Sequence, residues 1–243
     1  MWVILDAEPN NTIIKFLVTI WVALSMMGVA AAQDLAKATE AYNAAVAAVD
    51  SSRATVITLY EEALGMAEKL GEAGSGLASQ CQEALSPLYL SLGNDFIAAG
   101  NVDRAIKAFE QAVAYSEDEI SAQQLSYAYI VKAVACQKEK NLKGALENAQ
   151  KSVQHFDNPT AEKIIGMSAL SLKQNKVAAE AFEAYLSMTP SAITEEAGIV
   201  YNLGLALIAA GENDKACGYF REIAQDAEFG LAARYQIVVL KCE

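Results

Sequence analysis

The fold is decided by YLSLGNDFIAAGNVDRAIKAFEQA at residues 89–112 and by its second copy, VYNLGLALIAAGENDKACGYFREI, at residues 200–223. Both copies have Leu-Gly near the start, a bulky residue three positions after that glycine, and a second glycine seven positions after it. Alanine follows the second glycine by five positions, and phenylalanine follows the alanine by four. This spacing predicts two antiparallel helices joined by a short turn, because small residues recur where two helices would approach each other.

The recurring positions have mechanical roles. Gly93 and Gly204 are expected to leave room for the backbone of the neighbouring helix, and Ala105 and Ala216 to allow the same approach from the second helix. The two phenylalanines are expected to fill the space between successive helix pairs. The second glycine can end the first helix, and a nearby asparagine can cap the second. These turn and cap residues are Gly100, Gly211, Asn101 and Asn213.

The pattern resembles the tetratricopeptide repeat, whose consensus W-x2-L-G-x2-Y-x3-G-x4-A-x3-F-x2-A it follows. The resemblance implies an all-α fold, a right-handed α-solenoid of antiparallel helix pairs, with about five repeats. The implied repeats lie near residues 37–70, 86–119, 126–159, 159–192 and 197–230, and a cap helix follows at 231–243. Residues 71–85 lengthen the link between the first two repeats, and a longer second helix with a Gly-rich break is the simple explanation.

Composition supports the helical fold. The chain has 243 residues, 53% of them hydrophobic, with many alanines and only four prolines to interrupt helices. The formal net charge of −12 comes without a cluster of Lys and Arg. A duplex-binding surface needs such a cluster to displace counterions from phosphates, so no nucleic-acid partner is expected.

The N-terminal segment, residues 1–32, predicts an export signal. Lys15 precedes an uncharged apolar run at residues 16–32 that closes on three alanines, which is the order of a secretory signal peptide. Cleavage is expected after Ala32. Asp6 and Glu8 do not suit the basic start of such a signal, and a misassigned N-terminal extension before Lys15 would explain them.

An uncleaved anchor is the alternative for this segment, because residues 13–32 are close to the length that spans a bilayer. Both interpretations place residues 33–243 outside the cytoplasm, in the periplasm or cell envelope of a bacterium. The anchored form would be held at the inner membrane by residues 13–32, and this segment is the one expected contact with a membrane.

The four cysteines, Cys81, Cys136, Cys217 and Cys242, lack the paired spacing of a metal site. Cys136 and Cys217 fall on helical positions that suit a small buried residue, which favours buried free thiols. A bridge between Cys217 and Cys242 that ties down the last helix stays open as an alternative in an oxidising compartment.

No constellation for catalysis is present in the sequence. The single histidine, His155, lies at a predicted helix end, and the Gly-rich segment 71–76 lacks the Lys-Ser/Thr ending of a phosphate-binding loop. The acidic clusters at 61–62, 117–119 and 195–196 are expected to be solvated charges. The sequence therefore predicts no enzyme, no metal and no cofactor.

The family resemblance implies that the first helices of the repeats line a concave groove. The candidate groove residues between the consensus positions are Leu90, Asn94, Ile97, Tyr127, Ile130, Val134, Gln137, Lys163, Met167, Leu170, Tyr201, Leu205 and Ile208. They are largely apolar with several tyrosines, which suits an extended or helical peptide. Ordinary core packing is the alternative for these positions.

Taken together, the sequence predicts an exported interaction module, an adaptor or assembly factor that binds a polypeptide in its groove. The alternative is a structural subunit of an envelope complex that self-associates through the groove or the C-terminal helix. The sequence does not identify the partner.

Overall fold

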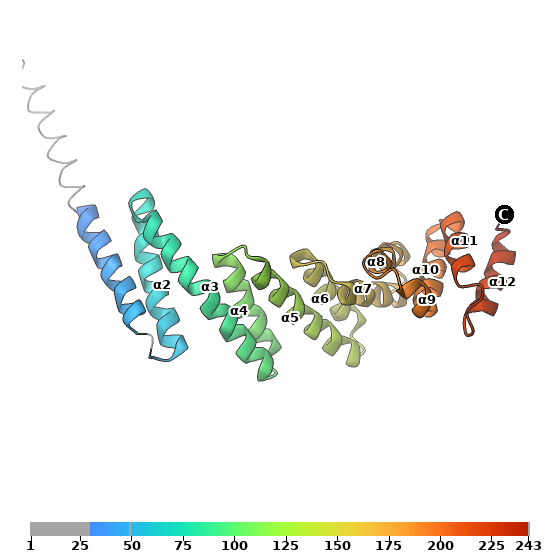
Figure 1. The fold of residues 1–243 in the computed structure, drawn as a ribbon, viewed down its shortest axis with the longest axis horizontal. Coiled ribbons are helices and arrows are strands. Elements are labelled where there is room, and N and C mark those ends of the chain that lie inside the picture. Colours follow the sequence, from blue (N-terminus) through green and yellow to red (C-terminus); the bar gives the residue numbers. More distant parts are fainter. Residues whose placement is uncertain (1–29, 49, 243) are drawn as a thin grey trace, which may run out of the picture. The chain divides into compact units, whose positions relative to one another are not determined.

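The computed structural model describes residues 30–48 and 50–242, and helices joined by short turns make up this part of the chain (Figure 1). The predicted signal peptide lies outside the described residues except for residues 30–32, which begin a helix that runs to residue 47. Cleavage after Ala32 would shorten this helix. No helix among the described residues is both long and apolar enough to cross a bilayer.

The elements follow one another with short connections. After the helix at residues 30–47 come α2 (Arg53–Lys69), the 3-10 helix η1 (Gly71–Gly74), α3 (Ser75–Ala98), α4 (Val102–Tyr115), α5 (Glu119–Lys138), α6 (Leu142–His155), α7 (Pro159–Ser171), α8 (Asn175–Met188), α9 (Ala192–Glu195), α10 (Ala197–Ala210), α11 (Asn213–Glu222) and α12 (Gly230–Leu240). The Gly-rich break is the single turn η1, and the extra length after it belongs to α3 and not to the preceding helix.

The described chain forms two compact units, one ending at Tyr89 and the other beginning at Leu90 inside α3. In the N-terminal unit, the rings of Tyr42 and Tyr60 pack edge to face at 5.5 Å, which joins the helix at 30–47 to α2. The Tyr89 hydroxyl donates to the Glu61 carboxylate at 2.5 Å, which joins α3 to α2.

In the C-terminal unit, each helix packs against its neighbours in the chain. The pairs α5–α6, α7–α8 and α10–α11 form the repeats, and α4–α5, α6–α7, α8–α10 and α11–α12 join one repeat to the next (Figure 1). Buried side chains from α5 to α12 form one continuous apolar core. This arrangement confirms the prediction of a solenoid of antiparallel helix pairs.

In three repeats a glycine of the first helix lies against a phenylalanine ring of the second. A Cβ atom placed on Gly204 would lie 2.4 Å from the Phe220 ring, and one on Gly166 would lie 2.5 Å from the Phe182 ring. Gly93 meets Phe109 in the same way, at 2.4 Å. The role predicted for Gly93 and Gly204 is therefore wrong in one respect, since each makes room for a ring of its own repeat and not for a backbone.

The repeat at 126–159 has different residues at the positions of the glycine and the ring. At the two equivalent positions it has Ala133 and Ala149, both fully buried. Ala133 takes the position of the glycine, and Ala149 takes the position of the phenylalanine. Two small side chains thus replace the glycine and the ring, so this helix pair does not use the glycine–ring contact.

The turns between paired helices keep one backbone geometry. Gly100 and Gly211 have φ angles of 74° and 86°, which confirms that they end the first helices in the left-handed region. Lys140 and Lys173 take the equivalent positions with φ angles of 59° and 61°. A side chain in this region costs about 1–2 kcal/mol, so the remaining packing of these repeats holds the geometry that glycine adopts freely.

The capping residues differ in part from the prediction. Asn101 is the N-cap of α4, although its side chain makes no capping hydrogen bond. Asn213 is the first residue of α11 and Glu212 is its N-cap, so the predicted cap at Asn213 is wrong. Asn141 caps α6 by accepting a hydrogen bond from the Gly144 amide at 2.9 Å.

A disulfide joins Cys217 of α11 to Cys242, just after α12, with a Cα–Cα distance of 5.7 Å. The prediction of a buried free thiol at Cys217 is therefore wrong, and the alternative pairing is the one the structure contains. Cys81 is free and buried, and Cys136 is free and half-buried. The bridge closes a loop over a sequence separation of 25 residues.

A double-mutant cycle should reveal the glycine–ring contact. Gly166→Ala alone should lower the free energy of unfolding by about 1–3 kcal/mol, because the methyl group overlaps the Phe182 ring. Phe182→Ala alone should cost about 3–5 kcal/mol by leaving a cavity. In the double variant the overlap is gone, so urea unfolding should show less loss than the sum. Strict additivity would contradict this account.

Reduction of the disulfide should weaken the C-terminal end of the chain. Cross-linking a loop of this length stabilises a fold by about 3–4 kcal/mol. We therefore expect dithiothreitol to lower the melting temperature of the wild-type protein. A Cys217→Ser, Cys242→Ser variant should melt at the lower temperature with or without the reductant, and Cys81→Ser serves as the control that keeps the reductant effect.

Candidate interaction surface

The candidate groove residues lie on α3, α5, α7 and α10, the first helices of four repeats. We call the surface that they define the first-helix face. Asn94, Tyr127 and Met167 are exposed, with Tyr127 at 50% and Met167 at 38%. Half-buried positions are Leu90, Ile97, Val134, Gln137, Lys163, Leu170, Tyr201, Leu205 and Ile208. Ile130 is only 7% exposed and belongs to the core.

The exposed part of this face is continuous between two repeats. The Asn202 side-chain amide on α10 lies 3.7 Å from the Met167 sulfur on α7 and donates a weak hydrogen bond to it. The methionine therefore lies beside the next first helix, with 38% of its surface open to solvent. A flexible thioether beside an amide can adapt to ligands of different shape.

Tyr201, predicted to line the groove, packs against two aromatic rings. Its ring centroid lies 5.6 Å from that of Phe220 and 5.7 Å from that of Phe229. A charged side chain at this position would disturb the packing of α10, α11 and the segment before α12. Tyr127 and Met167, which are exposed, are the residues that test binding without testing stability.

Lys163 is engaged in a network that joins α7, α8 and α10. Its ammonium group forms an ion pair with the Glu196 carboxylate, which also accepts a hydrogen bond of 2.5 Å from the Tyr185 hydroxyl. The ammonium lies 5.5 Å from the centroid of the Tyr185 ring. The prediction that Glu196 is a solvated charge is therefore wrong. The positive charge of Lys163 on the first-helix face is balanced by Glu196.

These contacts shift two pKa values in opposite directions. The hydrogen bond from Lys163, followed by the one from Tyr185, holds the pKa of Glu196 below its ordinary value. Burial, followed by the hydrogen bond to Glu196, raises the pKa of Tyr185. Both shifts favour the observed pairing of an ionised carboxylate with a neutral phenol.

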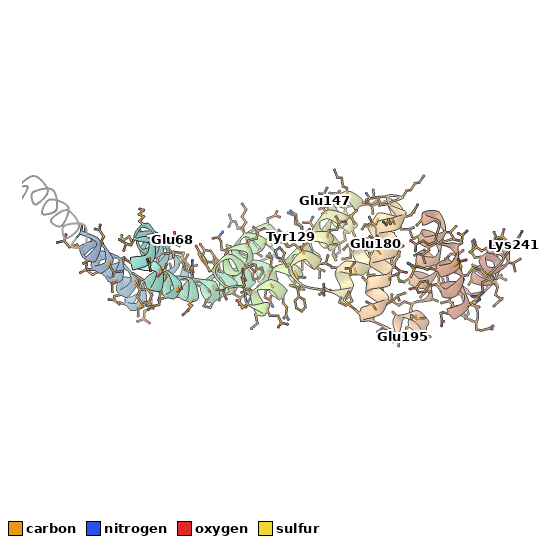
Figure 2. The ribbon with its side chains drawn as sticks, turned by 90° about the horizontal axis from the view of Figure 1, so that it is seen from above. Glu68, Tyr129, Glu147, Glu180, Glu195 and Lys241 are labelled. Carbon is orange, nitrogen blue, oxygen red and sulfur yellow. A yellow bond between two sulfur atoms is a disulfide. The ribbon has the colours of Figure 1, made fainter. Side chains whose placement is uncertain are left out.

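A second tyrosine network joins α4, α5 and α6. The Tyr129 hydroxyl donates to the Glu110 carboxylate at 2.8 Å, and the ring of His155 stacks on the tyrosine ring at 5.9 Å (Tyr129 is labelled in Figure 2). Burial, with the contact to Glu110, raises the pKa of Tyr129 to about 12. His155 is the last residue of α6 and packs on an aromatic ring. This environment is structural.

The other acidic clusters also serve the fold in part. Asp118 is the N-cap of α5 and accepts hydrogen bonds from the backbone amide and the hydroxyl of Ser121, both at 2.8 Å. These bonds hold the pKa of Asp118 below its ordinary value. Within the described part of the chain, no three His, Cys, Asp or Glu side chains are grouped so that they could hold a metal ion.

A hollow of about 510 Å³ lies beside the turn before α4 and is lined by Gly100, Asp103, Lys132 and Cys136 among others. Lys132 and Asp103 form an ion pair at 2.5 Å across it. The hydrogen bond from Lys132 lowers the pKa of Asp103. Because the two opposite charges are already paired, the hollow offers no excess charge to a ligand.

Two exposed residues of α12 extend the first-helix face and were not predicted. Tyr235 and Val239 follow Tyr201 and Leu205 by one repeat length, which is about 34 residues in this kind of repeat. They are 66% and 53% exposed. Their spacing from Tyr201 and Leu205 could have identified them in the sequence. They were missed because α12 was interpreted as a shielding cap.

Comparison with known proteins gives one family and several distant structures. Residues 90–162 and 163–230 match the tetratricopeptide repeat family, which is more than half of the chain. A MamA structure from AMB-1 is 17% identical, with a TM-score of 0.40, and covers 81% of this chain and 96% of that chain. MamA from Desulfovibrio magneticus RS-1 is 16% identical, with a TM-score of 0.38 and coverages of 64% and 93%. No curated protein matches the sequence.

The junction around Glu196 should be sensitive to acid. Its pKa is lowered in the folded state, so its stabilising effect is present above the unfolded value of 4.5 and is lost as pH falls through the folded value. Glu196→Gln should have a lower melting temperature than wild type at pH 7. Its melting temperature should fall less than that of wild type when the pH is lowered to 3. Glu195→Gln, at the exposed neighbour, is the control and should keep the wild-type profile. An unchanged acid response in Glu196→Gln would contradict the assignment.

Proposed function

Because the chain belongs to the tetratricopeptide repeat family, we propose that it is an exported protein-interaction module that binds a polypeptide on its first-helix face. Repeat families of this kind present extended surfaces formed by successive helices. The observation that carries the proposal is the exposure of Tyr127 and Met167 at positions between the packing residues of their helices. Neither side chain is among the buried residues of the apolar core.

The chemistry of the face favours a ligand with apolar side chains. An aromatic ring, a thioether and the amides of Asn94 and Asn202 offer dispersion contacts and hydrogen bonds without a net charge. The charge of Lys163 is balanced by Glu196. An extended or helical polypeptide segment fits such a surface better than a strongly acidic ligand does. The role is binding and not catalysis, since the polar groups gathered near the face are paired with one another.

Two features support export. The apolar run at residues 16–32 follows Lys15 in the order of a secretory signal. The Cys217–Cys242 bridge is of a kind that persists in oxidising compartments and is rare in the cytosol. We place the protein in the periplasm or envelope of a bacterium, as an adaptor or assembly factor. Retention of residues 13–32 would tether it to the inner membrane.

The location has a direct test. The complete sequence is expressed in a bacterium, and the protein recovered from the periplasm is measured by intact mass before and after alkylation. We expect a mass that lacks residues 1–32 and contains one disulfide. A reduced, full-length protein confined to the cytosol would contradict export without affecting the binding proposal.

Binding is tested with a variant that changes only exposed residues. Tyr127→Glu combined with Met167→Glu should weaken binding of a partner at least tenfold, because two apolar contacts are replaced by charges that must be desolvated. Met188→Glu is the matched control, since Met188 is 37% exposed against 38% for Met167 but lies at the end of α8, a second helix.

The partner is identified by affinity capture from an envelope extract, and its affinity is then measured by calorimetry with purified components. Circular dichroism checks that all variants keep wild-type helicity. Loss of binding in the double variant with retention in Met188→Glu supports the first-helix face. Equal binding by all three proteins would place the interaction elsewhere.

A further inference from the structure

Helix α12 has two apolar faces. On one face Ala233 is fully buried, and Ile237 and Leu240 pack against the core of the C-terminal unit. On the other face Leu231 and Val238 are 76% and 75% exposed. An exposed apolar face of this kind on a repeat-protein helix favours association.

The repeat register shows what the exposed face corresponds to. Val238 lies one repeat length after Gly204, and Gly204 receives the ring of Phe220 from the second helix of its own repeat. Leu231 lies one repeat length after Ala197, which is 6% exposed. The exposed face of α12 is thus equivalent to the face of α10 on which α11 packs. Its exposed side chains are apolar, and Val238 in place of glycine means that a helix packed on it would lie farther from α12 than α11 lies from α10.

We propose that α12 of a second copy occupies this face, so that two chains form a dimer through antiparallel pairing of their α12 helices. In the register that sets Leu231 opposite Val238 of the second copy, Val238 also meets Leu231 by symmetry. Such a contact is isologous: each copy uses the same patch and the assembly closes at two chains.

The same register makes the flanking residues complementary. Tyr235 then lies opposite Arg234 of the other copy, a cation–π arrangement. Arg234 also donates to the Ala224 carbonyl, which holds its guanidinium beside α12. Glu228 lies two residues before α12 and Lys241 directly after it, so these opposite charges come near each other at the two ends of the pair. Both of these side chains are exposed within their own chain.

Overall charge also favours this face for contact between copies. Each chain carries −12, so most surfaces of two copies repel each other. Residues 230–241 contain no Asp or Glu and include two basic residues, Arg234 and Lys241. Two copies therefore meet here with less repulsion than at surfaces where Asp and Glu outnumber Lys and Arg.

The disulfide makes the face rigid. Cys242 is joined to Cys217 of α11, so α12 is held in place before a second copy arrives. Preorganisation of this kind reduces the entropy lost on association. The paired helices are short, with 11 residues each, and so bury less area than a standard interface. The dimer is accordingly weak, with a dissociation constant in the micromolar range.

Sedimentation velocity over a range of concentrations tests the pairing, on protein purified after expression of the complete sequence. Wild type should shift from monomer to dimer as concentration rises. Val238→Glu should raise the dissociation constant at least tenfold, and should keep wild-type helicity because Val238 is exposed. Ile120→Glu is the matched control: Ile120 is 61% exposed on α5, and the variant should dimerise as wild type does.

A charge exchange tests the register. Glu228→Lys and Lys241→Glu should each weaken the dimer several-fold by setting like charges opposite each other, and the double variant should recover most of the loss. Failure of the double variant to recover would overturn the antiparallel register. Monomers at every concentration up to about 200 µM, or a dimer unaffected by Val238→Glu, would overturn self-pairing.

The dimer can be tested separately from the groove proposal, although Tyr235 belongs to both surfaces. Tyr127→Glu with Met167→Glu should leave the dimer unchanged, because neither residue lies on α12. Loss of the dimer in that variant would assign self-association to the first-helix face and overturn pairing through α12.

Discussion

The rest of the C-terminal unit depends on the contact between a bare glycine backbone and a buried phenylalanine ring. In the repeats of Gly93, Gly166 and Gly204 the ring leaves no space for a methyl group, so it fixes how close the two helices of a pair lie. Because the ring is fully buried by this contact, it also fixes the rotation of the second helix about its own axis. Once the pair is set, the side chains at the remaining positions of the first helix face the neighbouring repeats or solvent.

The first helices therefore both pack in the core and form the proposed binding surface. The first helix of each repeat uses its glycine and neighbouring apolar residues against the second helix, and presents the intervening residues outward. The ion pair of Lys163 with Glu196 and the hydrogen bond of Tyr185 join successive repeats at the edge of this surface. The packing of the helices therefore sets the spacing of exposed groups such as Tyr127 and Met167 before any ligand binds.

The helix pairs, the glycine-ended turns and the repeat period could be predicted from sequence, because each depends on residues a few positions apart. The environment of single side chains could not. Whether Ile130 is core or surface depends on the helix that packs beside it, and Lys163 is neutralised by a residue 33 positions away. The pairing of Cys217 with Cys242 depends on how α12 returns to α11, which spacing alone leaves open. Lys140 and Lys173 show that a turn can keep its geometry after its glycine is gone.

The cross-link at α11 and α12 has a consequence for the order in which the C-terminal unit comes apart. Where helices touch only their neighbours, opening starts at an end, since the last helix has a partner on one side only. Here that helix is covalently attached to the one before it, so it cannot peel away singly. Thermal fluctuations at this end must therefore open α11 and α12 together.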